Sequence, residues 1–163
     1  DSLQETVLAG VLVGNEGVVL EQVEGLHSFS FRVKPGFRFP LHTAAPGKIF
    51  LSQLEPKLRS SMISKLNLTK FTSNTIVTPN RLEEEIQKVL DLGYAIDYEE
   101  EINGQACIGA PVFGRNAKLA GSIWLVAATN RLPRKQVPEV ASMVTKSADE
   151  ISLSLGNQFL LVA

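Results

Sequence analysis

The single cysteine is the residue of this sequence with the clearest capacity for covalent chemistry. Cys107 is a potential nucleophile or redox thiol, but its neighbours from Gly104 to Phe113 are mostly small and apolar. A free cysteine in such a run is typical of a buried small side chain, whereas a reactive cysteine needs an accessible thiolate. Nucleophilic catalysis also needs a base beside the nucleophile, and the only histidines are His27 and His42. We therefore predict no catalytic residue and interpret Cys107 as part of a core or of a pocket wall.

Four acidic side chains lie close together in the sequence, at Asp97 and from Glu99 to Glu101. Such a cluster can attract a metal ion, but a run of charges after a strand is usually a solvated loop, and that interpretation is preferred here. Asp97 differs from the others, because the alternation from Ala95 to Tyr98 places it at a strand end. A single carboxylate beside a cavity can accept hydrogen bonds from a ligand or from backbone amides. No metal site and no cofactor are predicted.

The segment from His42 to Lys48 has the features of a helix start. Pro46 suits a first helical turn, because it fixes φ and lacks the N–H group that would be unpaired there. The free N–H groups and the positive end of a helix bind carboxylates and other anions, and small residues at 44 and 45 let a ligand approach the backbone. The alternative is a tight turn that packs against a sheet, and the segment alone leaves both open.

Length and composition limit the class of protein. A chain of 163 residues fits one domain, and a net charge of −1 provides no basic surface for a phosphate backbone. One cysteine excludes an internal disulfide, and no apolar run reaches the roughly 18 residues that suggest a membrane span. Glycine-rich phosphate loops, hydrolase serine motifs and zinc-ligand spacings do not occur. We expect a cytoplasmic domain without membrane contacts. The start at Asp1, without Met or a signal peptide, suggests a piece of a longer protein.

Turn and capping residues divide the chain into short elements. A Gly-rich turn at 14–17 between two apolar β-branched runs predicts a hairpin, and period-2 alternation over 29–34 predicts a third strand. Thr78-Pro79 marks a helix start and Gly93 a helix end. The predicted strands are 6–13, 18–23, 29–34, 95–98, 107–113 and 119–127, and the predicted helices are about 46–54, 55–66, 79–92 and 134–155.

The strands are expected to gather into one antiparallel sheet with helices packed on it, which is the α+β class. The last predicted helix carries a stripe of apolar residues three and four positions apart, at Val137, Val140, Val144, Ala148, Ile151 and Leu155. This stripe is expected to pack along its whole length, either in the core or against another copy of the chain.

Four stretches of the sequence form a series that covers nearly the whole chain. They are Pro40-Leu41-His42 with Gly47-Lys48, then Gly93 to Glu100, then Gly104 to Phe113 and, more loosely, Leu153 to Gly156. In this order they resemble the motifs of the C-terminal effector-binding domain of the IclR family of bacterial transcription regulators. The block from Gly93 to Phe113 is the most specific part of the resemblance. The winged helix-turn-helix that precedes this domain in the family is not in this sequence.

The resemblance implies that residues 1–163 form a GAF-like effector-binding and oligomerisation domain of the α+β class, an antiparallel sheet with helices on both sides. It implies a regulator and not an enzyme, a homodimer or homotetramer that binds a small-molecule effector and reaches DNA only through the missing N-terminal domain. The family's pocket positions correspond to Ala44, Ala45, Pro46 and Gly47 at the helix start, Asp97, Cys107, Trp124 and Val126 on the strands, and Phe31 and Phe39 as apolar walls.

The sequence departs from the family pattern at three of these positions. Regulators of small-acid metabolism commonly have hydroxyl side chains where this chain has Ala44, Trp124 and Val126. Each lost donor removes about 1–3 kcal/mol of complementarity to a compact polar ligand. Trp124 with Phe31 and Phe39 instead favours an aromatic or apolar effector whose single carboxylate meets the helix start. The alternatives are a structural oligomerisation module whose pocket is filled by the tryptophan, and a GAF-type redox enzyme, which would need a second cysteine.

Overall fold

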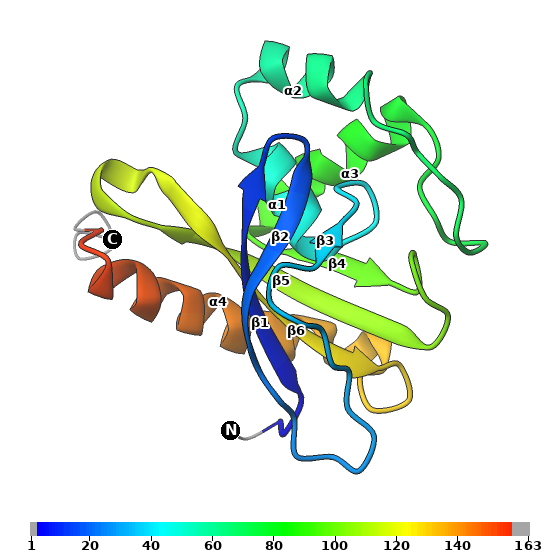
Figure 1. Ribbon diagram of the computed structural model, residues 1–163, viewed down its shortest axis with the longest axis vertical. Helices are drawn as coiled ribbons and strands as arrows, with labels where there is room; N and C mark the ends of the chain where they lie inside the picture. The colour runs from blue at the N-terminus through cyan, green and yellow to red at the C-terminus, as the bar shows by residue number, and fades with distance from the viewer. Residues whose placement is uncertain (1–2, 158–163) are drawn as a thin grey trace.

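The computed structural model describes residues 3–157, which contain six β-strands and four α-helices (Figure 1). Residues 1–2 and 158–163, and with them the predicted start at Asp1, lie outside the described residues. No helix between residues 3 and 157 is long and apolar enough to cross a membrane. The elements are β1 (Thr6–Val13), β2 (Glu16–Val23), β3 (Arg38–Phe39), α1 (Ala45–Ser52), α2 (Pro56–Ile63), α3 (Pro79–Leu92), β4 (Ala95–Tyr98), β5 (Gln105–Phe113), β6 (Leu119–Ala128) and α4 (Val137–Ser154).

All six strands belong to one antiparallel sheet in the order β3-β2-β1-β6-β5-β4. The hairpin β1–β2 joins the C-terminal strands through the pairing of β1 with β6, in which Thr6 lies opposite Val126. The first and last thirds of the chain therefore meet in the middle of the sheet. Helices and antiparallel strands in this arrangement confirm the predicted α+β class.

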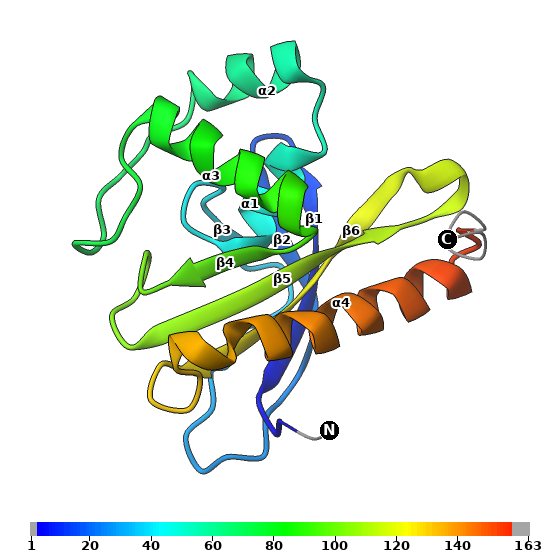
Figure 2. The ribbon, with the colours of Figure 1, turned by 180° about the vertical axis from the view of Figure 1, so that it is seen from behind.

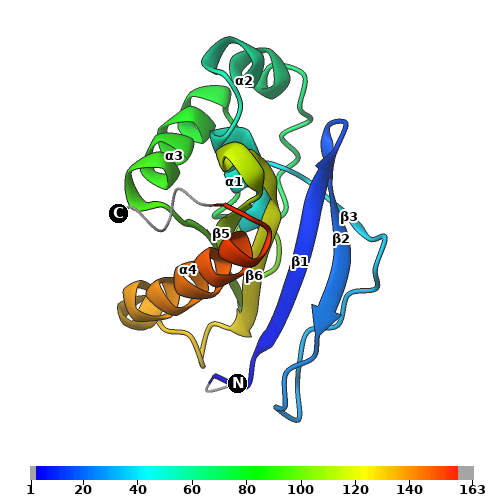
Figure 3. The ribbon, with the colours of Figure 1, turned by 90° about the vertical axis from the view of Figure 1, so that its left-hand side faces the viewer.

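The strands β5 and β6 are covered on both faces, and their alternating side chains separate two cores. One core contains Cys107, Trp124 and Val126 and lies under α1, with α3 packed on the far side of α1. The other contains Ile108 and Leu125 and lies under α4. Figure 2 shows α4 across β5 and β6, and Figure 3 shows α1 and α4 at the two sides of these strands. The predicted placement of helices on both sides of the sheet is confirmed.

Helix α3 follows the local signals of its sequence closely. It begins at Pro79 and ends at Gly93, which has the left-handed φ of 77° that a glycine cap adopts without strain. Thr78 has the extended backbone of a cap residue, but its side chain makes no capping hydrogen bond. Its buried side chains are Leu82, Ile86 and Val89, whereas Leu90, which the helical spacing also predicts on the inner face, is exposed.

The predicted third strand is wrong. Residues 29–34 form no strand, and the strand that pairs with β2 is the short β3 further along. Side chains hold this segment in place of a backbone ladder, because the Thr6 hydroxyl donates to the carbonyl of Phe31 (2.9 Å) and the N–H of Val33 donates to Gln22 (2.6 Å). The alternation in the sequence is real. It reflects partial burial of Phe31 and Val33 against the core and not membership of the sheet.

The apolar stripe of α4 is buried over its first three turns only. Ile151 and Leu155, predicted to continue the stripe, are 39% and 48% exposed. The buried position in the last turns belongs to Ser152, whose hydroxyl accepts from the N–H of Phe113 (2.9 Å) and donates to the carbonyl of Ala148 (2.7 Å). A polar contact to the extended β5–β6 hairpin, visible beside the end of α4 in Figure 1, thus replaces the expected apolar packing.

Candidate functional site

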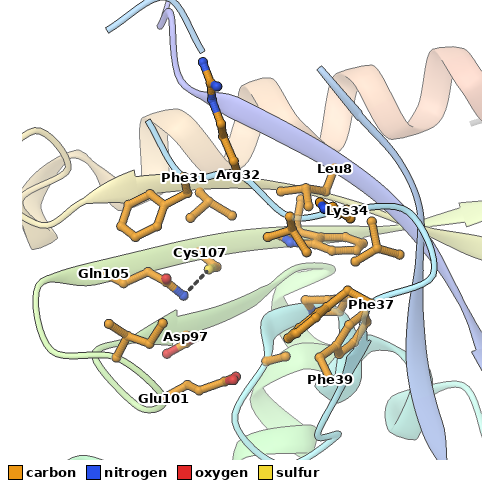
Figure 4. A pocket seen from close by; sticks show the side chains of 17 residues that line it. Leu8, Phe31, Arg32, Lys34, Phe37, Phe39, Asp97, Glu101, Gln105 and Cys107 are labelled. Atoms are coloured by element: carbon orange, nitrogen blue, oxygen red, sulfur yellow. Dashed lines mark hydrogen bonds between the residues drawn. The ribbon is translucent and has the colours of Figure 1, made fainter. Parts of the chain in front are cut away.

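A cavity of about 430 Å³ lies between the sheet, the start of α1 and the segment of residues 24–37, which we call the covering segment. Its size is within the usual range for small-molecule pockets. The lining extends from residues exposed at the surface, Arg32, Lys34 and Phe37, to the buried sheet residues Asp97 and Cys107. Figure 4 shows Asp97 and Glu101 on one side of this cavity and Phe31 and Leu8 across from them. The wall is mostly apolar and aromatic.

Eight of the ten predicted site residues line this one cavity. They are Phe31, Phe39, Ala44, Pro46, Asp97, Cys107, Trp124 and Val126. Ala45 and Gly47 do not line it. The side chain of Ala45 is fully buried against Gly109, and Gly47 packs against the backbone of Leu41. The helix start therefore presents alternate residues to the cavity, and the predicted contact of a ligand with Ala45 and Gly47 finds no support in the geometry.

Three of the polar and apolar wall positions form a row across the sheet. Asp97 on β4 lies opposite Cys107 on β5, and Cys107 lies opposite Val126 on β6. Directly opposed residues of neighbouring antiparallel strands project from the same face, so their side chains are neighbours. Trp124 lies two residues before Val126 on the same face. Residues that are up to 29 positions apart in the sequence are thus brought together by strand register alone.

Trp124 lies along the wall and does not fill the cavity. A Cβ built on Gly10 would lie 2.9 Å from Cη2 of the indole, so the ring uses space that only glycine leaves open on β1. Gly109 lies opposite Trp124 on β5, and Phe39 packs edge-on against the indole with ring centroids 5.4 Å apart. The ring is fixed between these neighbours, and the cavity remains in front of it.

Asp97 is a buried carboxyl, 1% exposed, on the floor of the cavity. Its Oδ1 accepts a hydrogen bond from the N–H of Glu100 at 2.9 Å. Burial raises the pKa of Asp97 to about 6, and the positive charge of Lys48 and the hydrogen bond from Glu100 act in the opposite direction. A carboxyl with this pKa is largely ionised at neutral pH, and its hydrogen-bond partners are the N–H of Glu100 and the thiol of Cys107.

The thiol of Cys107 is not arranged for catalysis. Burial, and then the negative charge of Asp97, raises the pKa of Cys107 well above its usual value. The amide of Gln105 lies 3.4 Å from its Sγ (Figure 4). Because only the thiolate is a strong nucleophile, a buried thiol with a raised pKa suits a pocket wall.

The acidic run after β4 is not the solvated loop that the sequence suggested. Glu100 is buried and pairs with Lys48, whose side chain is fully buried, and Nζ of Lys48 also donates to the carbonyl of Ile96 at 2.7 Å. Glu101 is half-buried at the cavity and accepts a hydrogen bond from the hydroxyl of Thr43 at 3.1 Å. Within residues 3–157 no group of three His, Cys, Asp or Glu side chains is placed to hold a metal ion.

Comparison with known proteins shows the family of this chain. The family described as bacterial transcriptional regulator IclR, C-terminal, matches residues 1–153. The chain belongs to the IclR family. It corresponds to the regulatory C-terminal domain of that family, and its curated relatives are transcriptional regulators.

Two IclR-family relatives show how much of such a protein this chain represents. The transcriptional repressor IclR of Escherichia coli K12 is 29% identical over 154 residues, and the regulator BhcR of Paracoccus denitrificans is 30% identical over 151 residues. Each alignment covers 93% of this chain but only 56% and 54% of the relatives. The chain spans about half the length of the curated relatives that it matches.

Solved structures of IclR-family proteins have the same fold. The crystal structure of IclR from Thermotoga maritima gives a TM-score of 0.88 at 30% identity, and covers 95% of this chain and 63% of that chain. The inducer-binding domain of PobR from Acinetobacter, a double mutant in complex with 3-hydroxybenzoic acid, gives a TM-score of 0.80 at 26% identity, over 91% of this chain and 87% of that chain.

The IclR resemblance did not identify nine further residues of the cavity wall. They are Leu8, Val19, Arg32, Val33, Lys34, Phe37, Glu101, Ile102 and Gln105. Four of them come from the covering segment, which the sequence analysis treated as a strand and a turn. The alternation of apolar residues around Phe31 does indicate that Phe31 and Val33 face the interior. Glu101 had no such signal, because its partner Thr43 is 58 residues away in the sequence.

Proposed function

We propose that this chain is the effector-binding domain of an IclR-type transcription regulator, and that the cavity beside Asp97, Cys107 and Trp124 is its effector site. The observation that supports this most is the cavity itself, formed from eight of the ten predicted positions. A preformed, mostly apolar cavity with a few converging polar groups is the usual form of a small-molecule site. The aromatic wall suits a ligand with an aromatic or apolar body.

The proposed effector acts through quaternary state. A ligand shifts an equilibrium between two arrangements only by its difference in affinity for them. The effector would stabilise one arrangement of a homodimer or homotetramer and so change DNA binding by an N-terminal domain that this sequence does not contain. The relatives, which are about twice as long and are transcriptional regulators, support this part of the proposal.

The sequence analysis predicted a carboxylate on the effector, and this stays a prediction. The relative PobR was crystallised with an aromatic acid, 3-hydroxybenzoic acid, which supports an aromatic ligand class for the domain. In this chain the two helix-start residues expected to receive the carboxylate, Ala45 and Gly47, do not reach the cavity. The charge of the effector is therefore a separate question from its aromatic body.

Filling the cavity is expected to abolish ligand binding without unfolding the domain. Ala44 lines the cavity at the start of α1, so the change Ala44→Leu places three additional carbon atoms in the ligand space. A ligand at about a hundred times its Kd stabilises the parent chain by about 2.7 kcal/mol. We expect a rise in melting temperature for the parent with at least one compound of an aromatic panel, and none for Ala44→Leu.

The matched control is Ala120→Leu, the same change at an exposed position of β6. It should keep the full ligand-induced rise in melting temperature. An equal rise in Ala44→Leu and the parent contradicts the site, and no response of the parent to any compound favours the structural oligomerisation module.

A further inference from the structure

The charges inside the cavity are acidic, and its cations lie at the surface. Asp97 and Glu101 both line the interior, and each contributes to the electrostatic environment of the other. Arg32 and Lys34 belong to the exposed part of the covering segment. The side chain of Arg32 is 72% exposed, pairs with Glu24 at 3.0 Å and points away from the cavity in Figure 4. The interior therefore carries two carboxylates, and Arg32 does not face them.

The nearest buried cation, Lys48, lowers the pKa of Asp97 but does not line the cavity. Nζ of Lys48 is bound by Glu100 and by the carbonyl of Ile96, so its charge is already shared. Glu101 receives one hydrogen bond, from Thr43 to Oε2, and no hydrogen bond within residues 3–157 uses its Oε1. Glu101 is partly buried and its Oε1 is accessible, because the one buried side-chain nitrogen or oxygen without a partner in residues 3–157 is Oε2 of Glu100. Oε1 of Glu101 can therefore accept a hydrogen bond from a ligand in the cavity.

A second polar group in the wall is also without a partner. Trp124 is 5% exposed, and no hydrogen bond in the described part of the chain uses its indole N–H. This N–H is accessible, because the one buried side-chain nitrogen or oxygen without a partner in residues 3–157 is Oε2 of Glu100. The wall thus offers acceptors to a ligand at Asp97 and Glu101, and a complementary ligand carries a hydrogen-bond donor.

From this pattern we propose, building on the function proposed above, that the effector is an aromatic amine. Its ammonium group would donate to the carboxylates of Asp97 and Glu101, and its ring would lie against Trp124, Phe31 and Phe39. An ammonium compensates both acidic groups in a mostly apolar cavity, where charge pairs are stronger than in bulk solvent. A carboxylate at the same position would meet like charge, so an acidic effector is the competing outcome.

Three probes of similar size separate these possibilities: 2-phenylethylamine, 2-phenylethanol and phenylacetate. They share a phenyl ring and differ in the charge of the terminal group. We expect calorimetric titration of the 163-residue chain to show the tightest binding for the amine and the weakest for the acid. The change Glu101→Gln keeps the side-chain shape and an acceptor for Thr43 but removes the charge. It is expected to weaken amine binding by about tenfold and to leave 2-phenylethanol nearly unchanged.

The control is Glu99→Gln, two residues away in the same loop. Glu99 does not line the cavity, and its Oε1 accepts from the N–H of Gly104, a bond that glutamine can keep. It should bind the amine as the parent does. Tighter binding of phenylacetate than of the amine, or equal amine affinity in Glu101→Gln and the parent, overturns the proposal and leaves the effector site intact. If none of the three probes and no compound of the wider aromatic panel binds, both proposals fail.

The affinity for the amine is expected to fall on acidification. Asp97 is faced by Lys48 from α1, by Glu100 and Glu101 from the loop after β4 and by Cys107 from β5, and its pKa is about 6. An ammonium group binds the ionised carboxylate, so binding is strongest above this pKa and is lost as pH falls through it. Titration at about pH 7.5 and about pH 5 should differ by roughly tenfold, since the amine stays protonated at both. Tighter amine binding at the lower pH contradicts the assignment of Asp97 as a partner.

Discussion

Replacing Lys48 with methionine is expected to lower the free energy of unfolding by about 3–5 kcal/mol, the usual cost of breaking a buried ion pair by removing one partner. The Lys48 side chain is fully buried, and it holds Glu100 and the carbonyl of Ile96. Methionine has a similar length but no charge, so Glu100 would remain buried without its cation. One oxygen of Glu100, Oε2, already has no hydrogen-bond partner. Chemical denaturation monitored by circular dichroism measures this loss.

The double variant Lys48→Met/Glu100→Gln should recover a substantial part of that stability, because it removes the unpaired charge together with its partner. The matched control is Lys88→Met, which removes a lysine from an exposed pair with Glu85 on α3. Exposed pairs contribute about 0.5 kcal/mol or less, so this variant should unfold like the parent. A Lys48→Met chain as stable as Lys88→Met would show that the buried pair contributes little.

The same ion pair connects stability with the candidate site. Lys48 is on α1, Glu100 follows β4, and the N–H of Glu100 donates to Asp97. The neighbouring Glu101 accepts from Thr43, which precedes α1. The start of α1 and the loop after β4 are therefore joined by two side-chain bonds on either side of the cavity floor. A change at Lys48 is expected to disturb the position of both acidic cavity residues.

The elements with strong local signals were predicted well. Strand β1 and strand β4 have the predicted bounds, and α3 lies between the predicted proline and glycine. In each case the information is within the element, in alternation, in a fixed φ or in a cap. The resemblance to the IclR family then supplied the pocket positions, which no local pattern identifies. Sheet register, which sets Asp97 opposite Cys107, came only with the structure.

The errors have one physical cause, which is dependence on partners far along the chain. Glu100 and Glu101 appear solvated in the sequence, because the charge run gives no hint of Lys48 and Thr43, more than 50 residues away. The part of the covering segment from residue 29 to residue 34 was assigned to the sheet because its apolar and polar residues alternate as in a strand. Its burial arises from the cavity and the core beneath it, held by Thr6 and Gln22 from other strands.

The largest backbone effect is expected at Gly47. A Cβ at this position would lie 2.5 Å from both Cα and the carbonyl oxygen of Leu41, and backbone atoms cannot rotate aside as a flexible side chain can. Overpacking typically costs about 1–3 kcal/mol and sometimes more. Replacing a glycine in a helix with alanine stabilises the helix by about 1 kcal/mol at most, because alanine has the higher helix propensity. We expect Gly47→Ala to lower the free energy of unfolding by about 2 kcal/mol in the absence of any ligand.

This result distinguishes two explanations for a glycine at the helix start. If Gly47 served only as a pocket position that a ligand contacts, an added methyl group would alter binding and leave the free protein stable. In the structure Gly47 packs against Leu41, so the unliganded chain itself should be destabilised. Gly114→Ala is the control, since Gly114 has a φ of −93° and its nearest neighbour to an added Cβ is 3.8 Å away. Equal unfolding midpoints for the two variants would contradict the packing role. A midpoint shift confined to Gly47→Ala would show that the close approach of Leu41 to α1 requires a glycine at this position.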